Sequence, residues 1–311
     1  MIVIIIVLLI VVFVIGECFS MIGGYIAAVV TPFNDGKIDI EAFERYISFL
    51  SNSKISGIVV CGSTGEALSL SLEEKIQLIS TAQKITSGKI NLFAGVIDTA
   101  THTCIDFIKK TEELVDGFLC ICPFYIKPSQ NQIYDHFKAL SEATGKNIIL
   151  YNNPGRVGTS IDFSTLKKLS SQKNIVAVKE CTSDLSVFTT WRTAVKEDFA
   201  FLSGNDDTAC AALAMGANGV ISVTANIAPE LCATLYSAIK QSNFERFCVI
   251  RDALEPLHKL MFTEPSPAPV KYALSKLGLI KEELRMPLSP ISNGLKTKID
   301  KAMRDLNLET V

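Results

Sequence analysis

The chain has 311 residues, and its 32 acidic residues nearly balance its 30 basic residues. This balance argues against nucleic acid or an anionic membrane surface as a partner, because neither would be attracted by the net field of the protein. The nine cysteines are scattered through apolar segments and the three histidines stand apart, so zinc sites, histidine triads and disulfide frameworks are not expected. Small-molecule chemistry in the cytoplasm is the remaining expectation.

The first residues form an unusual apolar segment, MIVIIIVLLIVVFVI, at residues 1–15. This segment is shorter than the roughly 20 residues that a bilayer-spanning helix needs. It also lacks the basic region and the small-residue cleavage site of a signal peptide. Because Met21 opens a sequence typical of the start of a globular domain, residues 1–20 are interpreted as an extension from a misassigned start codon. The alternative is a membrane anchor.

From residue 21 onward, short apolar runs alternate with amphipathic stretches. The runs are rich in β-branched residues, as expected for buried strands, and the stretches repeat apolar residues every three or four positions, as expected for helices. Eight strands are predicted, at residues 25–30, 57–61, 91–95, 117–122, 147–151, 175–179, 199–204 and 219–223. Helices are predicted at 42–51, 72–85, 103–115 and 133–144, and Ser71 with Glu74 forms a capping box for the second of them.

This alternation predicts an α/β fold, a (β/α)8 TIM barrel of parallel strands. The alternative is an open, doubly wound sheet, but the chain has neither a GxGxxG turn after the first strand nor a P-loop. We expect the barrel at residues 21–242 and a C-terminal helical domain at 243–311, interrupted by the proline-rich sequence EPSPAP and by two later prolines.

Lys179 ends the apolar strand IVAVK, and the polar sequence CTSD follows Glu180. In (β/α)8 barrels the active site lies at the carboxyl ends of the strands, which is where this lysine is expected. Its amine is then either half-solvated at the rim or buried, where the neutral amine is favoured and can act as a nucleophile. Side chains alternate along a strand, so Glu180 is expected on the opposite face, without a catalytic role.

The second predicted strand is followed by GSTGE at residues 62–66, in which two glycines frame Ser63 and Thr64. Short hydroxyls and exposed backbone N–H groups can converge on both oxygens of a carboxylate ligand. The same sequence is also typical of a turn that enters a helix, with one of the hydroxyls as the N-cap. Both interpretations stay open on this motif alone.

Aromatic and basic side chains follow the fourth and fifth predicted strands. Phe124 and Tyr125 lie in the proline-bounded sequence CPFYIKPSQ, where aromatic packing is the simplest interpretation. Tyr151 leads into NNPGRVG, and its phenol can either relay a proton or anchor that loop. Arg156 in the same loop can bind a carboxylate through its forked donors or extend into solvent.

At the strand ends of one barrel, these residues supply a lysine nucleophile, a phenol, a carboxylate cradle and an arginine. The set is suited to Schiff-base chemistry on a 2-keto acid, in which the amine condenses with the carbonyl and the phenol moves protons. The iminium then stabilises an enamine that attacks a second carbonyl. This chemistry requires neither a metal nor an organic cofactor, and none is expected.

Six motifs, in the order GSTGE, CPFYIKPSQ, YNNPGR, IVAVKE, GVISV and EPSPAPVK, resemble those of the dihydrodipicolinate synthases, within the pyruvate-dependent class I aldolases. The resemblance extends from about Gly24 to Pro290. It implies a (β/α)8 barrel with a C-terminal helical domain, assembled as a homotetramer of two tight dimers. The implied reaction condenses pyruvate with L-aspartate 4-semialdehyde in lysine and diaminopimelate biosynthesis.

The resemblance also implies roles for the catalytic residues. Lys179 matches the Schiff-base lysine of the family, and Tyr151 matches its general acid/base. Thr64 matches the hydroxyl that relays protons. Tyr125 matches the tyrosine that one protomer lends across the tight dimer to its partner's site, where it completes a Thr-Tyr-Tyr relay.

Substrate-binding residues follow from the same resemblance. Ser63 and Thr64 lie where the family binds the carboxylate of pyruvate, and Ile221 lies where a backbone carbonyl borders pyruvate. Arg156 matches the arginine that receives the carboxylate of the aldehyde, which favours a small acidic aldehyde. Ser63, however, is similar to the Ser-Thr pair of the lyases that release pyruvate.

Two alternative functions therefore stay open. One is a pyruvate-releasing aldolase that acts on N-acetylneuraminate or on a 2-keto-3-deoxy sugar acid. The other belongs to a different class, a non-catalytic barrel tethered to a membrane by residues 1–15. The aldehyde that is consumed or released distinguishes the pyruvate-releasing aldolase from the synthase. The non-catalytic barrel differs from both enzymes because pyruvate would form no adduct with its lysine.

Feedback inhibition by lysine is a trait of regulated bacterial members, in which the effector binds near the second helix through polar and imidazole groups and a tyrosine. At these positions the chain has Ala67, Leu72 and Lys75, with Phe124 in place of the tyrosine. A cationic ligand would meet too few acceptors and one like charge. Weak or absent inhibition by lysine is therefore predicted.

Overall fold

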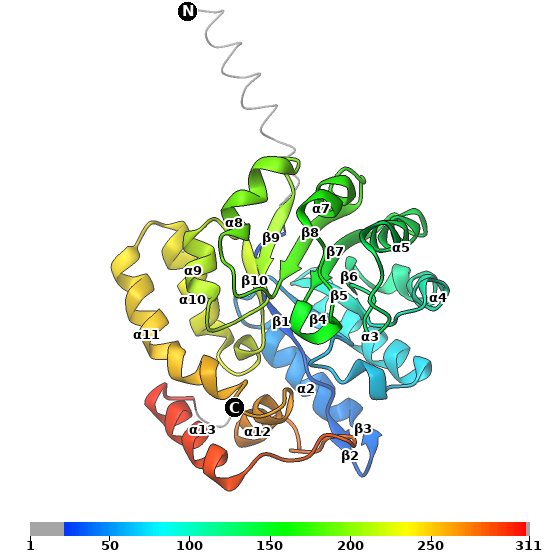
Figure 1. The fold of residues 1–311 in the computed structure, drawn as a ribbon. Helices are drawn as coiled ribbons and strands as arrows, with labels where there is room; N and C mark the ends of the chain where they lie inside the picture. Colours follow the sequence, from blue (N-terminus) through cyan, green and yellow to red (C-terminus); the bar gives the residue numbers. More distant parts are fainter. Residues whose placement is uncertain (1–21, 309–311) are drawn as a thin grey trace, which may run out of the picture.

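The computed structural model describes residues 22–308 (Figure 1), so the interpretation of residues 1–20 as an extension lies outside the described residues. Eight parallel strands close into a barrel in the order β1-β10-β9-β8-β7-β6-β5-β4. Their bounds are Gly24–Ala28 (β1), Gly57–Val60 (β4), Asn91–Val96 (β5), Gly117–Ile121 (β6), Asn147–Asn152 (β7), Ile175–Glu180 (β8), Ala200–Ser203 (β9) and Gly219–Ser222 (β10). The predicted (β/α)8 barrel is confirmed, and each strand lies within one or two residues of its predicted position.

Helices surround the barrel on its outside (Figure 1). The helices between β1 and the C-terminal segment are α2 (Ile40–Ser51), α3 (Leu72–Thr86), α4 (Thr101–Thr111), α5 (Gln130–Glu142), α6 (Pro154–Val157), α7 (Phe163–Leu169), α8 (Val187–Thr190), α9 (Ala209–Ala214) and α10 (Pro229–Lys240). Single 3-10 turns lie at Ala67–Ser69, Glu112–Leu114, Arg192–Ala194 and Thr224–Asn226. The capping box of Ser71 and Glu74 opens α3 as predicted.

Most residues of the barrel strands are buried, as expected for parallel strands between a barrel interior and a helical layer. All residues of β4 and β6 are buried, for example, and their sequences GIVV and GFLCI contain no charged residue. A two-stranded hairpin of β2 (Phe33–Asn34) and β3 (Lys37–Ile38) was not predicted. Strands of two residues are too short to display an alternating pattern.

The C-terminal segment contains α11 (Phe244–Leu260), α12 (Ala268–Lys276) and α13 (Asn293–Asp305), and α13 packs against both other helices. α12 begins inside the proline-rich motif, since prolines fit the first turn of a helix, where their missing N–H is not needed. α11 also packs against α10 of the barrel, so the boundary at residue 243 stays a prediction. Between residues 22 and 308, none of the helices combines the length and apolar character needed to cross a bilayer.

Candidate active site

Lys179 and Tyr151 lie on the neighbouring strands β8 and β7, and their Cα atoms are direct partners in the parallel ladder. The Nζ atom of Lys179 is 4.4 Å from the centroid of the Tyr151 ring. Only 7% of Lys179 and 4% of Tyr151 is exposed. Lys179 is therefore buried beside the phenol rather than half-solvated at the rim.

The stem of Lys179 runs past Gly204, the residue that follows β9. A Cβ atom at position 204 would lie 2.8 Å from Cε of Lys179 and would also overlap Sγ of Cys181. A carbon–carbon distance this short does not occur between non-bonded atoms, so the side chain of Lys179 would have to move. Glycine at this position is thus required for the observed path of the lysine side chain.

Cys181 is a neighbour of the lysine that the motif comparison did not single out. Burial raises the pKa of its thiol to about 11, while Lys179 and a hydrogen bond from Tyr151 act in the opposite direction. The thiol is therefore neutral at physiological pH. The sequence could have indicated this contact, because Cys181 lies two residues after Lys179 and residues i and i+2 share one face of a strand.

Glu180 points away from Lys179, as expected from strand alternation. Its carboxylate accepts hydrogen bonds from Nδ2 of Asn152 at 2.7 Å and from the backbone N–H of Thr182 at 2.9 Å. Burial raises the pKa of Glu180 to about 7. Asn152 also accepts from the N–H of Ile161, so Glu180 supports the loop after β7.

The loop GSTGE after β4 forms a tight turn. The N–H of Gly65 donates to the carbonyl of Gly62 at 3.0 Å, and the N–H of Glu66 donates to the carbonyl of Ser63 at 3.2 Å. The residues that precede the next 3-10 turn and α3 are Glu66 and Ser71. Neither Ser63 nor Thr64 is therefore the N-cap of a helix.

Arg156 lies in the short helix α6, where a loop was expected. Asn153 connects this helix to the phenol: its Oδ1 accepts from the N–H of Arg156 at 3.1 Å, and its Nδ2 donates to the hydroxyl of Tyr151 at 3.1 Å. Asn153 thus links the aldehyde-binding candidate to the acid/base candidate. Its side-chain contacts depend on the turn after β7 and were not evident from the motif.

A cavity of about 350 Å³ opens at this end of the barrel, and it is lined by both Ser63 and Arg156. Phe124 and residues of the C-terminal segment, among them Arg285 and Met286, complete the lining. Thr64, 9% exposed, lies next to Ser63 in the loop, and Ile221, 1% exposed, lies on β10 beside β1. The structure thus brings Ser63 and Arg156 to one cavity, whose lining does not include Thr64, Ile221, Lys179 or Tyr151.

Tyr125 differs from the other candidates because 89% of it is exposed. Its backbone has φ +69°, which lies in the left-handed region. The next residue, Ile126, is 61% exposed. Within one protomer Tyr125 is therefore a surface residue.

The model of the dihydrodipicolinate synthetase family matches residues 21–306. The chain belongs to this family. The 4-hydroxy-tetrahydrodipicolinate synthase of Laribacter hongkongensis is 38% identical over 290 residues, which cover 93% of this chain and 100% of the relative. The family predicted from the six motifs is thereby confirmed.

Solved structures of the dihydrodipicolinate synthase family are also similar. The crystal structure from Aquifex aeolicus has a TM-score of 0.90 and 36% identity, and it covers 93% of this chain and 99% of its own. The enzyme from Acinetobacter baumannii, solved in complex with pyruvate, has a TM-score of 0.89 and 34% identity over 92% of this chain and 99% of its own. These relatives are named as synthases, which favours the synthase over the sugar-acid lyase and the non-catalytic barrel.

Proposed function

We propose that Lys179 is the Schiff-base nucleophile and Tyr151 the general acid/base of this chain. As a member of its family, the chain is a lyase that condenses pyruvate with L-aspartate 4-semialdehyde in lysine and diaminopimelate biosynthesis. The observation that supports the two roles most directly is the ladder register, which sets the buried amine 4.4 Å from the centre of the phenol ring. An amine and a phenol at this separation can exchange protons through a bound substrate.

In the proposed reaction, the amine of Lys179 adds to the keto carbon of pyruvate, and loss of water yields an imine. Loss of a methyl proton converts the imine into an enamine. The enamine carbon then bonds to the aldehyde carbon of the second substrate, whose oxygen takes up a proton. Tyr151 and Thr64 are the proposed carriers of these protons.

The substrate-binding roles follow the positions of the remaining side chains. Ser63 and Thr64 are proposed to bind the carboxylate of pyruvate, beside the backbone carbonyl of Ile221. Arg156 is proposed to receive the carboxylate of the aldehyde, which its place in the same cavity as Ser63 supports. A guanidinium can hold such a carboxylate through two parallel hydrogen bonds.

Assembly is proposed as a homotetramer of two tight dimers, with Tyr125 lent to the partner's site. The exposure of Tyr125, together with that of Ile126 and of Leu68 at 68%, supports a contact surface at this position. Large apolar side chains of this kind are typical of surfaces that bind a partner. A cytoplasmic location stays a prediction.

Borohydride trapping tests the proposed nucleophile. Incubation with pyruvate and borohydride is expected to add one reduced pyruvate to the chain, and peptide mass spectrometry is expected to locate it on Lys179. Lys179→Ala should abolish the adduct and the activity. An adduct on another lysine, or activity that survives in Lys179→Ala, would contradict the assignment.

Activity with L-aspartate 4-semialdehyde, compared with the release of pyruvate from sugar acids, tests the second substrate.

Weak inhibition by lysine is also proposed. Ala67 is buried, Leu72 is half-buried, and the ammonium of Lys75 lies 5.9 Å from the ring of Phe107. This surface supplies a positive charge where a cationic effector would need acceptors. Steady-state assays with added L-lysine are expected to show little loss of rate, and an inhibition constant in the submillimolar range would refute the prediction.

A further inference from the structure

Glu66, the last residue of the GSTGE loop, is held from the C-terminal segment. Its backbone has φ +54°, a conformation that a side-chain-bearing residue adopts only when its surroundings impose it. Its Oε1 atom accepts a hydrogen bond at 2.5 Å from Nζ of Lys271 in α12, 205 residues further along the chain. The side chains of the pair are only 2% and 0% exposed.

Lys271 is itself confined by several contacts. Its ammonium also donates to the carbonyl of Glu283 at 2.7 Å and lies 4.2 Å from the centre of the Phe33 ring. Burial lowers the pKa of Lys271 to about 8, and the carboxylate of Glu66 opposes this fall. A buried charge without its partner is strongly unfavourable, so each member of the pair constrains where the other can lie.

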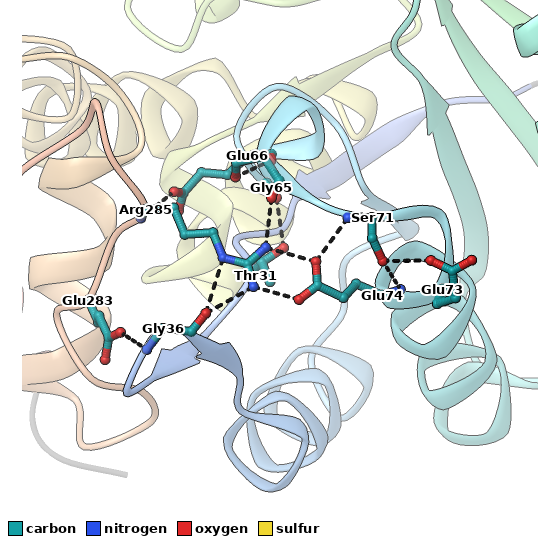
Figure 2. A network of polar contacts seen from close by, with 10 residues as sticks. Thr31, Gly36, Gly65, Glu66, Ser71, Glu73, Glu74, Glu283 and Arg285 are labelled. Carbon is teal, nitrogen blue, oxygen red and sulfur yellow. Dashed lines mark hydrogen bonds and ion pairs between the residues drawn. The ribbon is translucent and has the colours of Figure 1, made fainter.

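Arg285 forms the second anchor of the loop, as Figure 2 shows. Its backbone N–H donates to Oε2 of Glu66 at 3.1 Å. Its guanidinium donates to both oxygens of Glu74, at 2.5 and 2.8 Å, and to the carbonyls of Ser69 and Gly36 at 2.6 and 3.0 Å. The chain from Glu66 to Glu74 is thereby fixed to the C-terminal segment.

These anchors act on the part of the loop that carries the hydroxyls. The N–H of Glu66 donates to the carbonyl of Ser63, and the hydroxyl of Thr31 donates to the carbonyl of Gly65 at 2.7 Å. Glu66, Arg285 and Ser63 line the same cavity. A displacement of Glu66 would therefore move the turn that holds Ser63 and Thr64.

We propose that Glu66, Lys271 and Arg285 position the hydroxyls of Ser63 and Thr64 for the carboxylate of pyruvate, so that the C-terminal segment is a working part of the active site. All three are positioning residues that act through the loop. The inference rests on the proposed function, because it takes these hydroxyls as the pyruvate site. The resemblance to the family included Lys271 in the motif EPSPAPVK without giving it a role.

The test is the double variant Glu66→Gln/Lys271→Met, which removes both charges at once. A single substitution would leave one buried charge unpaired and could unfold the protein. In the double variant we expect the KM for pyruvate to rise by about tenfold or more, since the loop is no longer held in its productive geometry. The KM for the aldehyde should change by less than about threefold, because Arg156 is untouched. We expect kcat to fall as well, because the displaced loop also carries Thr64, a proposed proton carrier.

A matched control is Lys296→Met, which removes another ion pair from the same segment. Lys296 donates to Glu282 at 2.6 Å and lies over the ring of Tyr272. We expect this variant to lose thermal stability without a change in the KM for pyruvate. A purely structural role for the Glu66 pair would instead give the two variants the same kinetic profile and only different melting temperatures, and that result would overturn the inference.

Borohydride trapping at graded pyruvate concentrations separates this inference from the proposed function. If the wild-type protein forms no adduct, the proposed function fails and the inference fails with it. If the wild-type protein forms the adduct and the folded double variant reaches half-saturation at the same pyruvate concentration, only the inference is wrong. A shift of half-saturation to about tenfold higher pyruvate supports it.

Discussion

The room beside Lys179 depends on a single residue, Gly204. No side chain fits between Cε of Lys179 and Sγ of Cys181, although the backbone at this position needs no unusual φ. Lys179 is on β8 and Gly204 directly follows β9, so their proximity follows from the pairing of these two strands. A small change at Gly204 is therefore expected to act on catalysis through the position of the amine.

Gly204→Ala tests this dependence. The added methyl group is expected to displace the Lys179 amine and to lower kcat/KM by about 100-fold, while overpacking costs about 1–3 kcal/mol of stability. Gly145→Ala is the matched control, because a Cβ atom at Gly145 meets no atom within 4 Å. Steady-state kinetics and thermal unfolding measure both effects. If the folded Gly204→Ala protein has the kcat/KM of the wild-type protein, the prediction that catalysis depends on Gly204 is wrong.

Secondary structure elements were predicted where their pattern is long and regular. The eight strands and the four helices named from periodicity are present, because burial on one face or on both faces leaves a mark in the order of the residues. The β2–β3 hairpin and the four-residue helix α6 were missed, since a strand of two residues and a helix of about one turn are too short for the pattern of apolar residues to repeat. α6 matters for the site, because it carries Arg156.

The contact between α4 and α5 contains a buried histidine with a consequence for acid stability. His136 is 5% exposed, and its Nδ1 lies 2.9 Å from the hydroxyl of Thr101 at the start of α4. Burial lowers the pKa of His136 from 6.5 to about 4. The folded state therefore disfavours the imidazolium that the unfolded chain accepts readily below pH 6.5.

The sign of the effect follows from linkage. A lowered pKa in the folded state stabilises the protein above pH 6.5, and this contribution is lost as the pH falls from 6.5 towards 4. We expect His136 to account for a loss of about 3 kcal/mol over this range. Chemical denaturation at several pH values should show a shallower pH dependence for His136→Gln. The exposed His102→Gln should retain the wild-type dependence, and an unchanged slope in His136→Gln would contradict the assignment.

The whole molecule determines whether the site of one protomer is complete. Lys179, Tyr151, Ser63 and Arg156 come from one chain, whereas Tyr125 is exposed on its surface. If one protomer lends Tyr125 to its partner, each active site contains residues of two chains. Oligomer formation is then a condition for full activity.

Complementation between two inactive variants tests this arrangement. Lys179→Ala lacks the nucleophile, and Tyr125→Phe lacks the lent phenol, so each homo-oligomer should have low activity. Mixing the two under conditions of subunit exchange is expected to restore up to about a quarter of wild-type activity, because one site of a mixed dimer then has both groups. Full activity of Tyr125→Phe would contradict the lent-tyrosine proposal. So would a lack of recovery in mixtures whose oligomers native mass spectrometry shows to be mixed.

The sequence by itself determined the barrel, the approximate bounds of its strands and the family, because periodicity and short motifs are properties of neighbouring residues. It also indicated Lys179 and the side chains at the other strand ends. Only the tertiary structure decided that Lys179 is buried beside Tyr151, that Gly204 makes room for it, and that Lys271 reaches Glu66 across 205 residues. Such contacts depend on strand register and on how the C-terminal helices dock, and neither leaves a local pattern in the chain.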